Sequence, residues 1–303
     1  MVQYLNVASH KFDTNELMKA ILFFILFSIS LSAQITKGAV KDSLTGQPIP
    51  YANIWVENEN VATTSEEDGT FSIAVANTKN LIFSALGYET KTLKAAQVNQ
   101  VFLNPKAFDL DEVVISNSIG TKQNVIGLTQ NTVAQAFDNG PRIDVKFFPY
   151  ASEYKKTPYL KRVTVYTDSR IEDATVKLHF YKVDANGYPG DELLQKPLIV
   201  SVKNGTKINK IDLSDFGLVM PKNGLFVGFE KLMIEKNKKE KTVINPVTKE
   251  TQIQRTYYPL MLYNYVERDF LFTFSGGKWS KQTDDASGKI KVYEPAIHLT
   301  LTN

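Results

Sequence analysis

Residues 38–88 alternate apolar and polar side chains in short runs, and turn residues separate these runs. In one run Ile54 and Val56 share a face, and in another Phe71 and Ile73 do so. A period of two residues in runs this short is typical of strands in a β-sandwich, and it does not fit an amphipathic helix. The stretch therefore predicts a small β-domain.

The residues between these runs explain where the strands end. Asp68 and Gly69 form a tight-turn pair directly before Phe71. Pro48 and Pro50 cannot donate to a strand ladder, so they should flank a strand and not lie inside it. The pattern predicts a first β-sandwich over residues 34–105.

Four short motifs follow one another along this stretch. Their order and spacing together are more specific for a family than any single motif. The motifs are Gly38-x-Val40-x-Asp42, Thr45-Gly46-x-Pro48-Ile49-Pro50-Tyr51-Ala52-Asn53, Glu67-Asp68-Gly69-x-Phe71 and Leu86-Gly87-Tyr88. Together they resemble the carboxypeptidase-regulatory-like domain, a transthyretin-like β-sandwich at the N-terminus of exported Bacteroidetes proteins. The resemblance implies a domain without catalytic residues of its own. In agreement, the sequence has no His-x-x-Glu pair, and its three histidines lie far apart.

The beginning of the chain predicts export. Lys19 precedes the apolar run 20–31, and Ser32 and Ala33 follow it. This order is typical of a signal peptide, here 18–33, and the run is shorter than the roughly 20 residues of a membrane-spanning helix. Residues 1–17 then form an upstream extension before Met18, with a long polar leader as the alternative.

The absence of cysteine, which the composition shows, excludes a lipid-anchored N-terminus, disulfides and thiolate metal sites. We therefore expect an exported protein of the periplasm or the outer-membrane surface that is not a lipoprotein. The net charge of +3, from 35 basic and 32 acidic residues, is too balanced to predict nucleic-acid binding.

A polar stretch, 106–140, reads as a linker and contains Leu-Asp-Glu-Val-Val-Ile at 110–115. This segment is similar to one in TonB-dependent transporters, where a plug and a large barrel follow. Residues 141–303 are too few for a barrel of about 22 strands at roughly ten residues each, so we expect neither a transmembrane helix nor a barrel. Residues 110–115 are either an energy-transducer contact or a strand that closes one domain against the next.

Residues 141–303 predict a second all-β domain, a jelly-roll-like β-sandwich without helical periodicity. Residues 181–190 and 225–230 resemble uncharacterised jelly-roll domains of exported Bacteroidetes proteins. The expected strands are 143–148, 160–167, 175–183, 198–203, 207–213, 224–232, 257–265, 270–275 and 290–301.

Several features of this domain could suggest a site, and each has a plainer interpretation. His179 and His298 lie opposite apolar neighbours on their strands, which predicts surface positions without catalytic or metal partners. Residues 184–191 offer oxygen ligands but read as a turn, and 275–279 read as a hairpin turn and not a phosphate loop. The sequence predicts no catalytic, cofactor-binding or metal-binding residue and assigns no ligand-binding residue.

Residues 235–256 are too polar for a core and predict an arm, either functional or a solvated excursion. Trp55 lies opposite Ile54 and Val56, so it is either an exposed contact for a partner or sugar, or partly buried at a domain junction or sheet edge.

These features favour a non-catalytic cell-envelope binding or scaffold protein, with an unknown envelope protein or glycan as its partner and no cofactor. The alternatives are a carbohydrate hydrolase of jelly-roll fold and an accessory of a TonB-dependent uptake system. Binding would use exposed aromatic rings, for which the candidates are Trp279, Tyr257, Tyr258 and Tyr263. The plainer alternative is that most of these tyrosines pack inside the sandwich. Hydrolysis would need a pair of carboxylates, for which the acids are Glu230, Glu267, Asp269 and Glu294.

Overall fold

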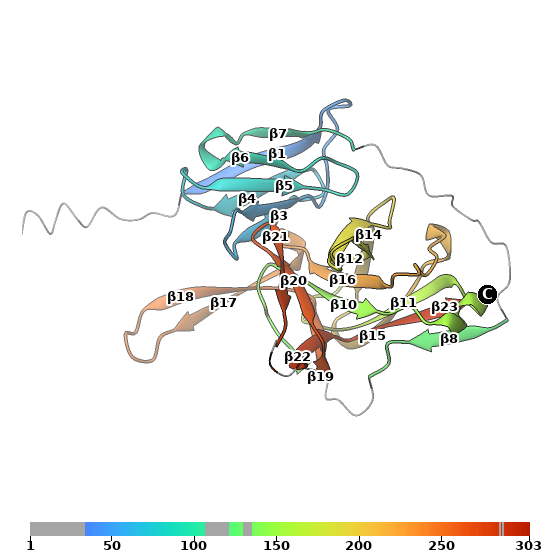
Figure 1. Cartoon of the computed structure of the whole chain (residues 1–303). Helices are drawn as coiled ribbons and strands as arrows, with labels where there is room; N and C mark the ends of the chain where they lie inside the picture. Colours follow the sequence, from blue (N-terminus) through green and yellow to red (C-terminus); the bar gives the residue numbers. More distant parts are fainter. Residues whose placement is uncertain (1–33, 107–120, 130–134, 285, 287) are drawn as a thin grey trace, which may run out of the picture. The chain divides into compact units, whose positions relative to one another are not determined.

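The structure is a computed structural model that describes residues 34–106, 121–129, 135–284, 286 and 288–303. The predicted signal peptide and the segment 110–115 lie outside these residues. Two groups of β-sheets, each with its own apolar core, make up the described chain (Figure 1). The helical elements among them are short: η1 Ala95–Gln97, η2 Ser152–Lys156, η3 Ser214–Phe216 and η4 Glu235–Asn237. The predicted all-β fold is confirmed, and no described helix is long and apolar enough to cross a membrane.

The first sandwich consists of a three-stranded sheet in the order β4-β1-β7 and a four-stranded sheet in the order β3-β2-β5-β6. Strands β1 and β7 are parallel, and the other described pairs of this sandwich are antiparallel. The bounds are β1 Ile35–Asp42, β2 Asn53–Val56, β3 Ala62–Thr64, β4 Thr70–Ala74, β5 Asn80–Ser84, β6 Lys91–Lys94 and β7 Gln100–Leu103.

The predicted alternation produces the core of this sandwich. Phe71 and Ile73 on β4 are buried, while the alternate residues of the strand, Thr70, Ser72 and Ala74, are exposed. Gly69 before β4 has φ +79°, and a Cβ there would lie 2.7 Å from the carbonyl oxygen of Val40. The predicted turn at 68–69 therefore needs glycine both for its backbone angle and for the close approach of β1.

The second group of strands forms two larger sheets. One has the order β13-β12-β16-β10-β20-β21, with β14 also paired to β12. Its bounds are β10 Ile143–Phe148, β12 Ala174–Val183, β13 Pro189–Glu192, β14 Leu198–Val202, β16 Leu225–Lys231, β20 Leu271–Ser275 and β21 Lys278–Gln282. The other has the order β22-β19-β11-β23-β8, with β15 paired to β11 and β9 to β19. Its bounds are β8 Gln123–Ile126, β9 Gln135–Ala136, β11 Tyr159–Ser169, β15 Gly205–Asp212, β19 Leu260–Arg268, β22 Ile290–Pro295 and β23 Ile297–Thr302.

The two larger sheets share one core, so this part of the chain is a second sandwich. Val176 and Leu178 on β12 belong to the same buried cluster as Val163 on β11 and Leu299 on β23. The jelly-roll topology stays a prediction. The expected linker, 106–140, contains β8 and β9, which pair with β23 and β19 of this sandwich.

Residues 238–257 form a two-stranded hairpin, as expected for the polar arm. Its strands are β17 Lys238–Ile244 and β18 Thr251–Tyr257, which pair only with each other within the described chain (Figure 1). Asn237 at its base is fully buried, and its side-chain amide bonds the backbone of Thr175 and Leu232 at 2.6–3.0 Å.

Candidate binding cleft with a buried charge network

A cleft of about 860 Å³ is bounded by turns of the first sandwich and by β12 of the second. Two of the motifs that carry the family resemblance line it, at 48–51 and 86–88. The second sandwich contributes β12, the segment that follows β13, and aromatic residues of β20 and β21. The cleft is thus built from turns of one sandwich and a sheet face of the other.

Strand alternation places three residues of β12 in this cleft. Lys177, His179 and Tyr181 share the face opposite Val176 and Leu178, which pack into the core. Both faces of β12 are covered from 174 to 180. The sequence correctly placed His179 opposite the core but wrongly expected a surface residue without partners, because the covering elements lie far away in the chain.

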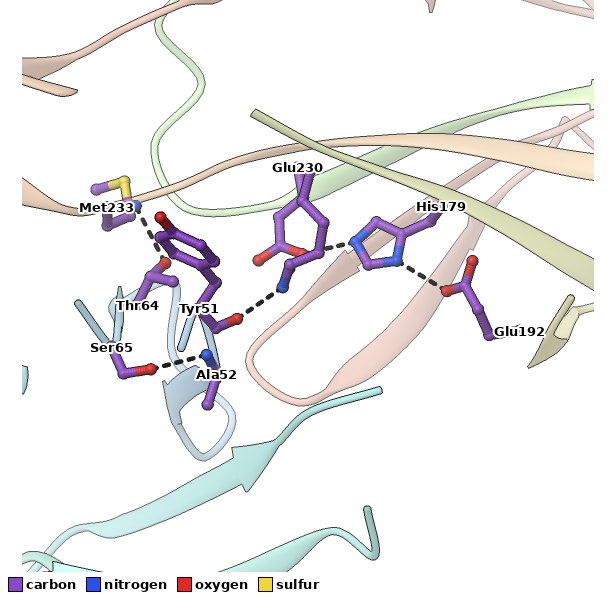
Figure 2. Close-up of polar contacts among 9 residues, drawn as sticks. Tyr51, Ala52, Thr64, Ser65, His179, Glu192, Glu230 and Met233 are labelled. Atoms are coloured by element: carbon purple, nitrogen blue, oxygen red, sulfur yellow. Dashed lines mark hydrogen bonds and ion pairs between the residues drawn. The ribbon is translucent and has the colours of Figure 1, made fainter. Parts of the chain in front are cut away.

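His179 lies between two carboxylates, as Figure 2 shows. Its Nδ1 is 2.8 Å from Oε2 of Glu192, and its Nε2 is 2.6 Å from Oε2 of Glu230. Burial of the ring lowers the pKa of His179, but the charges and hydrogen bonds of the two carboxylates outweigh burial and raise it to about 9. The ring is therefore an imidazolium at neutral pH, and each N–H donates to one carboxylate.

Glu230 also pairs with Lys177, whose Nζ lies 3.1 Å from the same Oε2. Burial raises the pKa of Glu230, but Lys177 and His179 outweigh burial and hold it at about 2. The Lys177 ammonium donates a second hydrogen bond, at 2.8 Å, to the carbonyl oxygen of Tyr51 in the first sandwich. Tyr51 itself has φ 56°, a left-handed backbone conformation.

Glu192 at the end of β13 completes the network. Its Oε2 accepts from His179, and its Oε1 accepts the backbone N–H of Phe180 at 2.5 Å. The four charged side chains Lys177, His179, Glu192 and Glu230 therefore form a chain of short ion pairs. We call these four residues the charge network.

Aromatic rings adjoin the charge network. Tyr181 stacks on His179 with centroids 5.3 Å apart and an interplanar angle of 8°. Trp279 meets Tyr181 edge-on at 5.4 Å, and Tyr51 and Tyr88 line the cleft from the first sandwich. Burial, followed by the charges of Glu192 and Glu230, raises the pKa of Tyr181 well above its usual value, so its phenol stays neutral.

This arrangement offers charge, hydrogen-bond donors and ring faces to a bound molecule. It offers less for acid–base chemistry, because both ring nitrogens of His179 are occupied and its ring fills the space between the two carboxylates. Among the residues that the structure describes, no group of three or more His, Cys, Asp or Glu side chains could hold a metal ion.

Of the four aromatic residues that the sequence nominated, Trp279 alone lines the cleft. Tyr258 and Tyr263 are buried, and Tyr263 donates to the buried carboxylate of Asp144 at 2.6 Å. Tyr257 is half-buried at the end of β18. Exposed rings at 258 and 263 are therefore ruled out, and the alternative that these tyrosines pack inside the sandwich holds for both.

The four acids that the sequence suggested for hydrolysis also lie at different sites. Glu230 belongs to the charge network, whereas Glu294 is buried in another ion cluster with Lys146 at 3.0 Å and Arg268 at 2.6 Å. Burial lowers the pKa of Lys146, and Glu294 opposes the shift. Glu267 and Asp269 line a separate pocket of about 490 Å³ beside this second cluster.

The remaining sequence expectations concern His298, Trp55 and two turns. His298 is half-buried against the ring of Tyr166, and burial followed by Lys146 lowers its pKa. Trp55 is 3% exposed and packs edge-on against Phe274 of the second sandwich at 5.5 Å. It is therefore not an exposed contact, and it is buried more completely than the expected partial burial at a domain junction or sheet edge.

The turn expected at 184–191 is present. The Asp184 carboxylate accepts the backbone N–H groups of Asn186 and Tyr188, both at 2.8 Å. The expected hairpin turn at 275–279 joins β20 to β21 through Gly276 and Gly277, both with positive φ.

Comparison with known proteins identifies the first sandwich. Residues 36–115 match the family model of the CarboxypepD_reg-like domain, as the motifs predicted. Residues of this chain are 33% identical over 113 positions to the TonB-dependent receptor SusC of Bacteroides thetaiotaomicron, covering 35% of this chain and 11% of the receptor. They are 32% identical over 108 positions to the TonB-dependent receptor P3 of Formosa agariphila, covering 33% of this chain and 11% of the receptor. The chain thus spans about a tenth of the length of these relatives.

Solved structures show weaker likenesses. A structure of infectious bursal disease virus, Gx strain, covers 88% of this chain and 62% of its own, with 8% identity and a TM-score of 0.23. A candidate carbohydrate binding protein from Bacteroides uniformis covers 76% of this chain and 98% of its own, with 12% identity and a TM-score of 0.17. At these TM-scores neither likeness carries an argument.

Proposed function

We propose that this protein is a non-catalytic binding protein of the bacterial cell envelope and that it recognises a glycan in the cleft. The observation that carries the proposal is the placement of ring faces beside fixed polar groups, with Tyr181 and Trp279 next to Lys177 and His179. Aromatic faces pack on the C–H faces of sugars, while fixed donors and acceptors orient their hydroxyls. The cleft volume of about 860 Å³ lies within the range of roughly 300–1,000 Å³ that ligand sites have.

An envelope location is supported by two features. Residues 36–115 match a domain that this chain shares with TonB-dependent receptors. Residues 18–33 have the order of charge, apolar run and small residues that is typical of a signal peptide.

The absence of catalysis is part of the proposal and rests on the charge network. A glycosidase needs two carboxylates that face the scissile bond across open space. Here Glu192 and Glu230 each hold one nitrogen of His179, and Glu230 is further held by Lys177. A sugar could reach a pair of this kind only after the ion pairs had separated.

Glycan binding can be tested on the purified chain with a glycan array followed by calorimetry. We expect at least one oligosaccharide to bind and the Trp279→Ala variant to bind it about tenfold more weakly, since stacking of one ring contributes roughly 1–2 kcal/mol. The matched control is Tyr293→Ala, which removes an aromatic ring that is 41% exposed and does not line the cleft.

An array without binding, or binding that Trp279→Ala leaves unchanged, would contradict the proposal. Mass spectrometry of the bound oligosaccharide after prolonged incubation tests the non-catalytic part, because shortened products would show hydrolysis.

A second candidate function is that of an accessory in TonB-dependent uptake. The observation that favours it is the match of this chain to two TonB-dependent receptors over about a tenth of their length. Co-purification of the exported protein with such a receptor from envelope fractions would support it, and its absence from every receptor complex would contradict it.

A further inference from the structure

The arm formed by β17 and β18 exposes apolar side chains near its turn. Val247 in the turn is 87% exposed, Ile244 is 61% exposed and Ile253 is 57% exposed. Every residue from 239 to 255 except Asn245 is exposed, and the two strands pair only with each other within the described chain. Apolar side chains that cluster at the surface mark a site of interaction more often than isolated ones do. The end of the arm is therefore a candidate contact surface.

The base of the arm is anchored, in contrast to its exposed end. Asn237 is fully buried, and its carbonyl oxygen accepts the backbone N–H of Tyr258 at 2.9 Å. The carboxylate of Glu66 in the first sandwich accepts the backbone N–H of Glu235 at 2.8 Å. A two-stranded hairpin alone is only marginally stable in water, so the anchored base is what holds the strands in place. The arm thus presents its apolar end from a fixed base.

The apolar side chains occur on both faces of the arm and in its turn. The register of the two strands places Ile244 and Ile253 on one face and Val243 on the other. Val247 lies in the turn between the strands. A groove on another protein covers one face of an inserted element, whereas a lipid layer surrounds whatever enters it. The distribution around the end of the arm therefore favours lipid as the occupant.

Cations lie behind the apolar end of the arm. Residues 235–257 carry six cations and three carboxylates. Two of these carboxylates form ion pairs with Lys238 at 2.6 Å and with Arg255 at 2.9 Å. Lys239 and Lys241 are exposed and form no ion pair with any residue that the structure describes. The excess of positive charge therefore remains after the ion pairs are counted, and it suits a negatively charged surface.

The same lysines disfavour a second copy of this chain as the occupant. β17 has one edge without a strand partner in the described chain, and two such edges could pair with each other. That pairing would bring Lys239 and Lys241 of both copies together. Lysines on an edge strand are a common protection against such association, because their charges repel.

We propose that the arm binds an anionic lipid surface. Ile244, Val247 and Ile253 enter the boundary between the headgroups and the acyl chains, and Lys239 and Lys241 face the headgroup phosphates. Both contributions are needed, because three apolar side chains alone bury little surface and hold a protein on lipid only weakly. The arm does not line the cleft, so lipid binding is independent of glycan recognition.

Tryptophan fluorescence tests whether the turn enters the lipid layer. The probes are vesicles of equimolar phosphatidylglycerol and phosphatidylcholine, and vesicles of phosphatidylcholine alone. With the anionic vesicles, the emission of Val247→Trp should shift to shorter wavelength, and acyl-chain bromination should quench it. Leu44→Trp is the matched control, because Leu44 is 81% exposed in a turn of the first sandwich, and its emission should not shift. Subtraction of the wild-type spectrum removes the emission of Trp55 and Trp279.

Sedimentation of the full chain with the same vesicles measures affinity. The pair Ile244→Thr with Ile253→Thr should weaken binding to anionic vesicles about tenfold, because it removes apolar surface but keeps a β-branched residue in each strand. The pair Lys239→Gln with Lys241→Gln should weaken it about fivefold, and this loss should be smaller at about 500 mM NaCl.

β15 supplies the matched controls, because it is another exposed strand with the same residue types. Ile208 is 58% exposed, and Lys207 and Lys210 are exposed on either side of it. Ile208→Thr, and the pair Lys207→Gln with Lys210→Gln, should therefore bind vesicles as the wild type does. All of these positions are exposed, so every variant should keep the melting temperature of the wild type.

Three outcomes would overturn lipid binding by the arm. One is an emission of Val247→Trp that anionic vesicles leave unchanged. Another is a loss of vesicle affinity that the β15 variants reproduce, since the effect would then come from net charge or overall hydrophobicity. The third is a dimer in sedimentation velocity that Ile244→Thr with Ile253→Thr dissociates, because a second copy would then cover the arm. Each of these results leaves glycan binding in the cleft standing, since none of the variants changes a residue that lines it.

Discussion

His179 links the stability of the protein to pH, because its two carboxylate partners favour the charged ring. Its pKa is about 9 in the folded protein, against an ordinary value near 6.5 in the unfolded chain. A raised folded-state pKa contributes stability that is fully present below about pH 6.5 and is lost as pH rises through about 9. The buried ion pairs should thus weaken on the alkaline side.

We therefore predict that the free energy of unfolding falls between about pH 6.5 and pH 9.5, by up to about 3 kcal/mol from this group. Urea unfolding at a series of pH values measures it. His179→Gln should remove most of the fall, and it should also destabilise the protein at pH 6 by about 3 kcal/mol, since it leaves Glu192 without its cation and Glu230 with Lys177 alone. Burial, followed by Lys146, lowers the pKa of His298, so this residue contributes a change of the opposite sign at the acidic end of this range. Parallel pH profiles of wild type and variant would disprove the assignment.

Asn237 provides a second test at single-residue scale. Its side chain makes three hydrogen bonds to the backbone of Thr175 and Leu232 in a fully buried position. Asn237→Ala should destabilise the protein by about 2–4 kcal/mol, because it leaves buried backbone groups without partners. Chemical denaturation checks this value against Asn186→Ala, an exposed turn position that should change stability little.

The sequence could predict which face of β12 His179 occupies but not what covers that face. Alternation along the strand places Lys177, His179 and Tyr181 on the face opposite the core residues between them. This can be read from the local sequence. The partners lie 13 and 51 residues away along the chain, so pairing could not be read from spacing. One signal was present: Glu230 ends a run of apolar residues in β16, and a carboxylate at such a position implies a buried cation nearby.

At the scale of elements, prediction succeeded where a strand carries several apolar anchors. β10 spans Ile143–Phe148, as expected, and packs apolar side chains on both of its faces. β8 was missed because Ile126 is its single buried residue, and pairing with β23 at the end of the chain makes it a strand. Strands held by long-range hydrogen bonds alone leave little trace in a local pattern.

The arm β17–β18 allows a clean excision, because its two strands pair only with each other within the described chain. Removal of residues 239–256 and closure of Lys238 onto Tyr257 by Asn-Gly would retain the last pair of the ladder. We expect the melting temperature to change by less than about 3 °C and glycan affinity to stay the same. Differential scanning calorimetry and titration measure both.

A loss of glycan affinity on excision, with the melting temperature retained, would show instead that the arm takes part in binding. The apolar side chains of Ile244 and Ile253, which are 61% and 57% exposed, would then be the residues to substitute.

At the scale of the whole molecule, the cleft depends on contacts between two sandwiches that each have their own core. The backbone N–H of Asn58 in the first sandwich donates to the carbonyl of Gly276 in the β20–β21 turn at 3.0 Å. A Cβ at Gly276 would lie 3.0–3.1 Å from backbone atoms of Asn58 and Glu59. Because backbone atoms cannot rotate away as side chains do, any side chain at 276 should push the two sandwiches apart.

Gly276→Ala therefore tests whether function needs the sandwiches in contact. Gly187→Ala is the matched control: both glycines have positive φ, but a Cβ at Gly187 meets nothing within 4 Å. In both variants alanine in a left-handed backbone costs about 1 kcal/mol. The difference in stability between the two variants therefore reports the contact between the sandwiches alone. Hydrogen exchange of the Asn58 amide should accelerate in Gly276→Ala, whereas the Ala39 amide, bonded to Asn99 within the first sandwich, should not change.

If the cleft needs both of its walls, glycan affinity should fall in the variant in which the Asn58 amide loses protection from hydrogen exchange. Tyr51 and Tyr88 form one wall and Tyr181 and Trp279 the other, so a displaced turn separates the ring faces that would hold the sugar. If glycan affinity is unchanged although the Asn58 amide exchanges faster, the binding site lies on one sandwich alone. The carbonyl of Tyr51 would then be only a structural acceptor for Lys177.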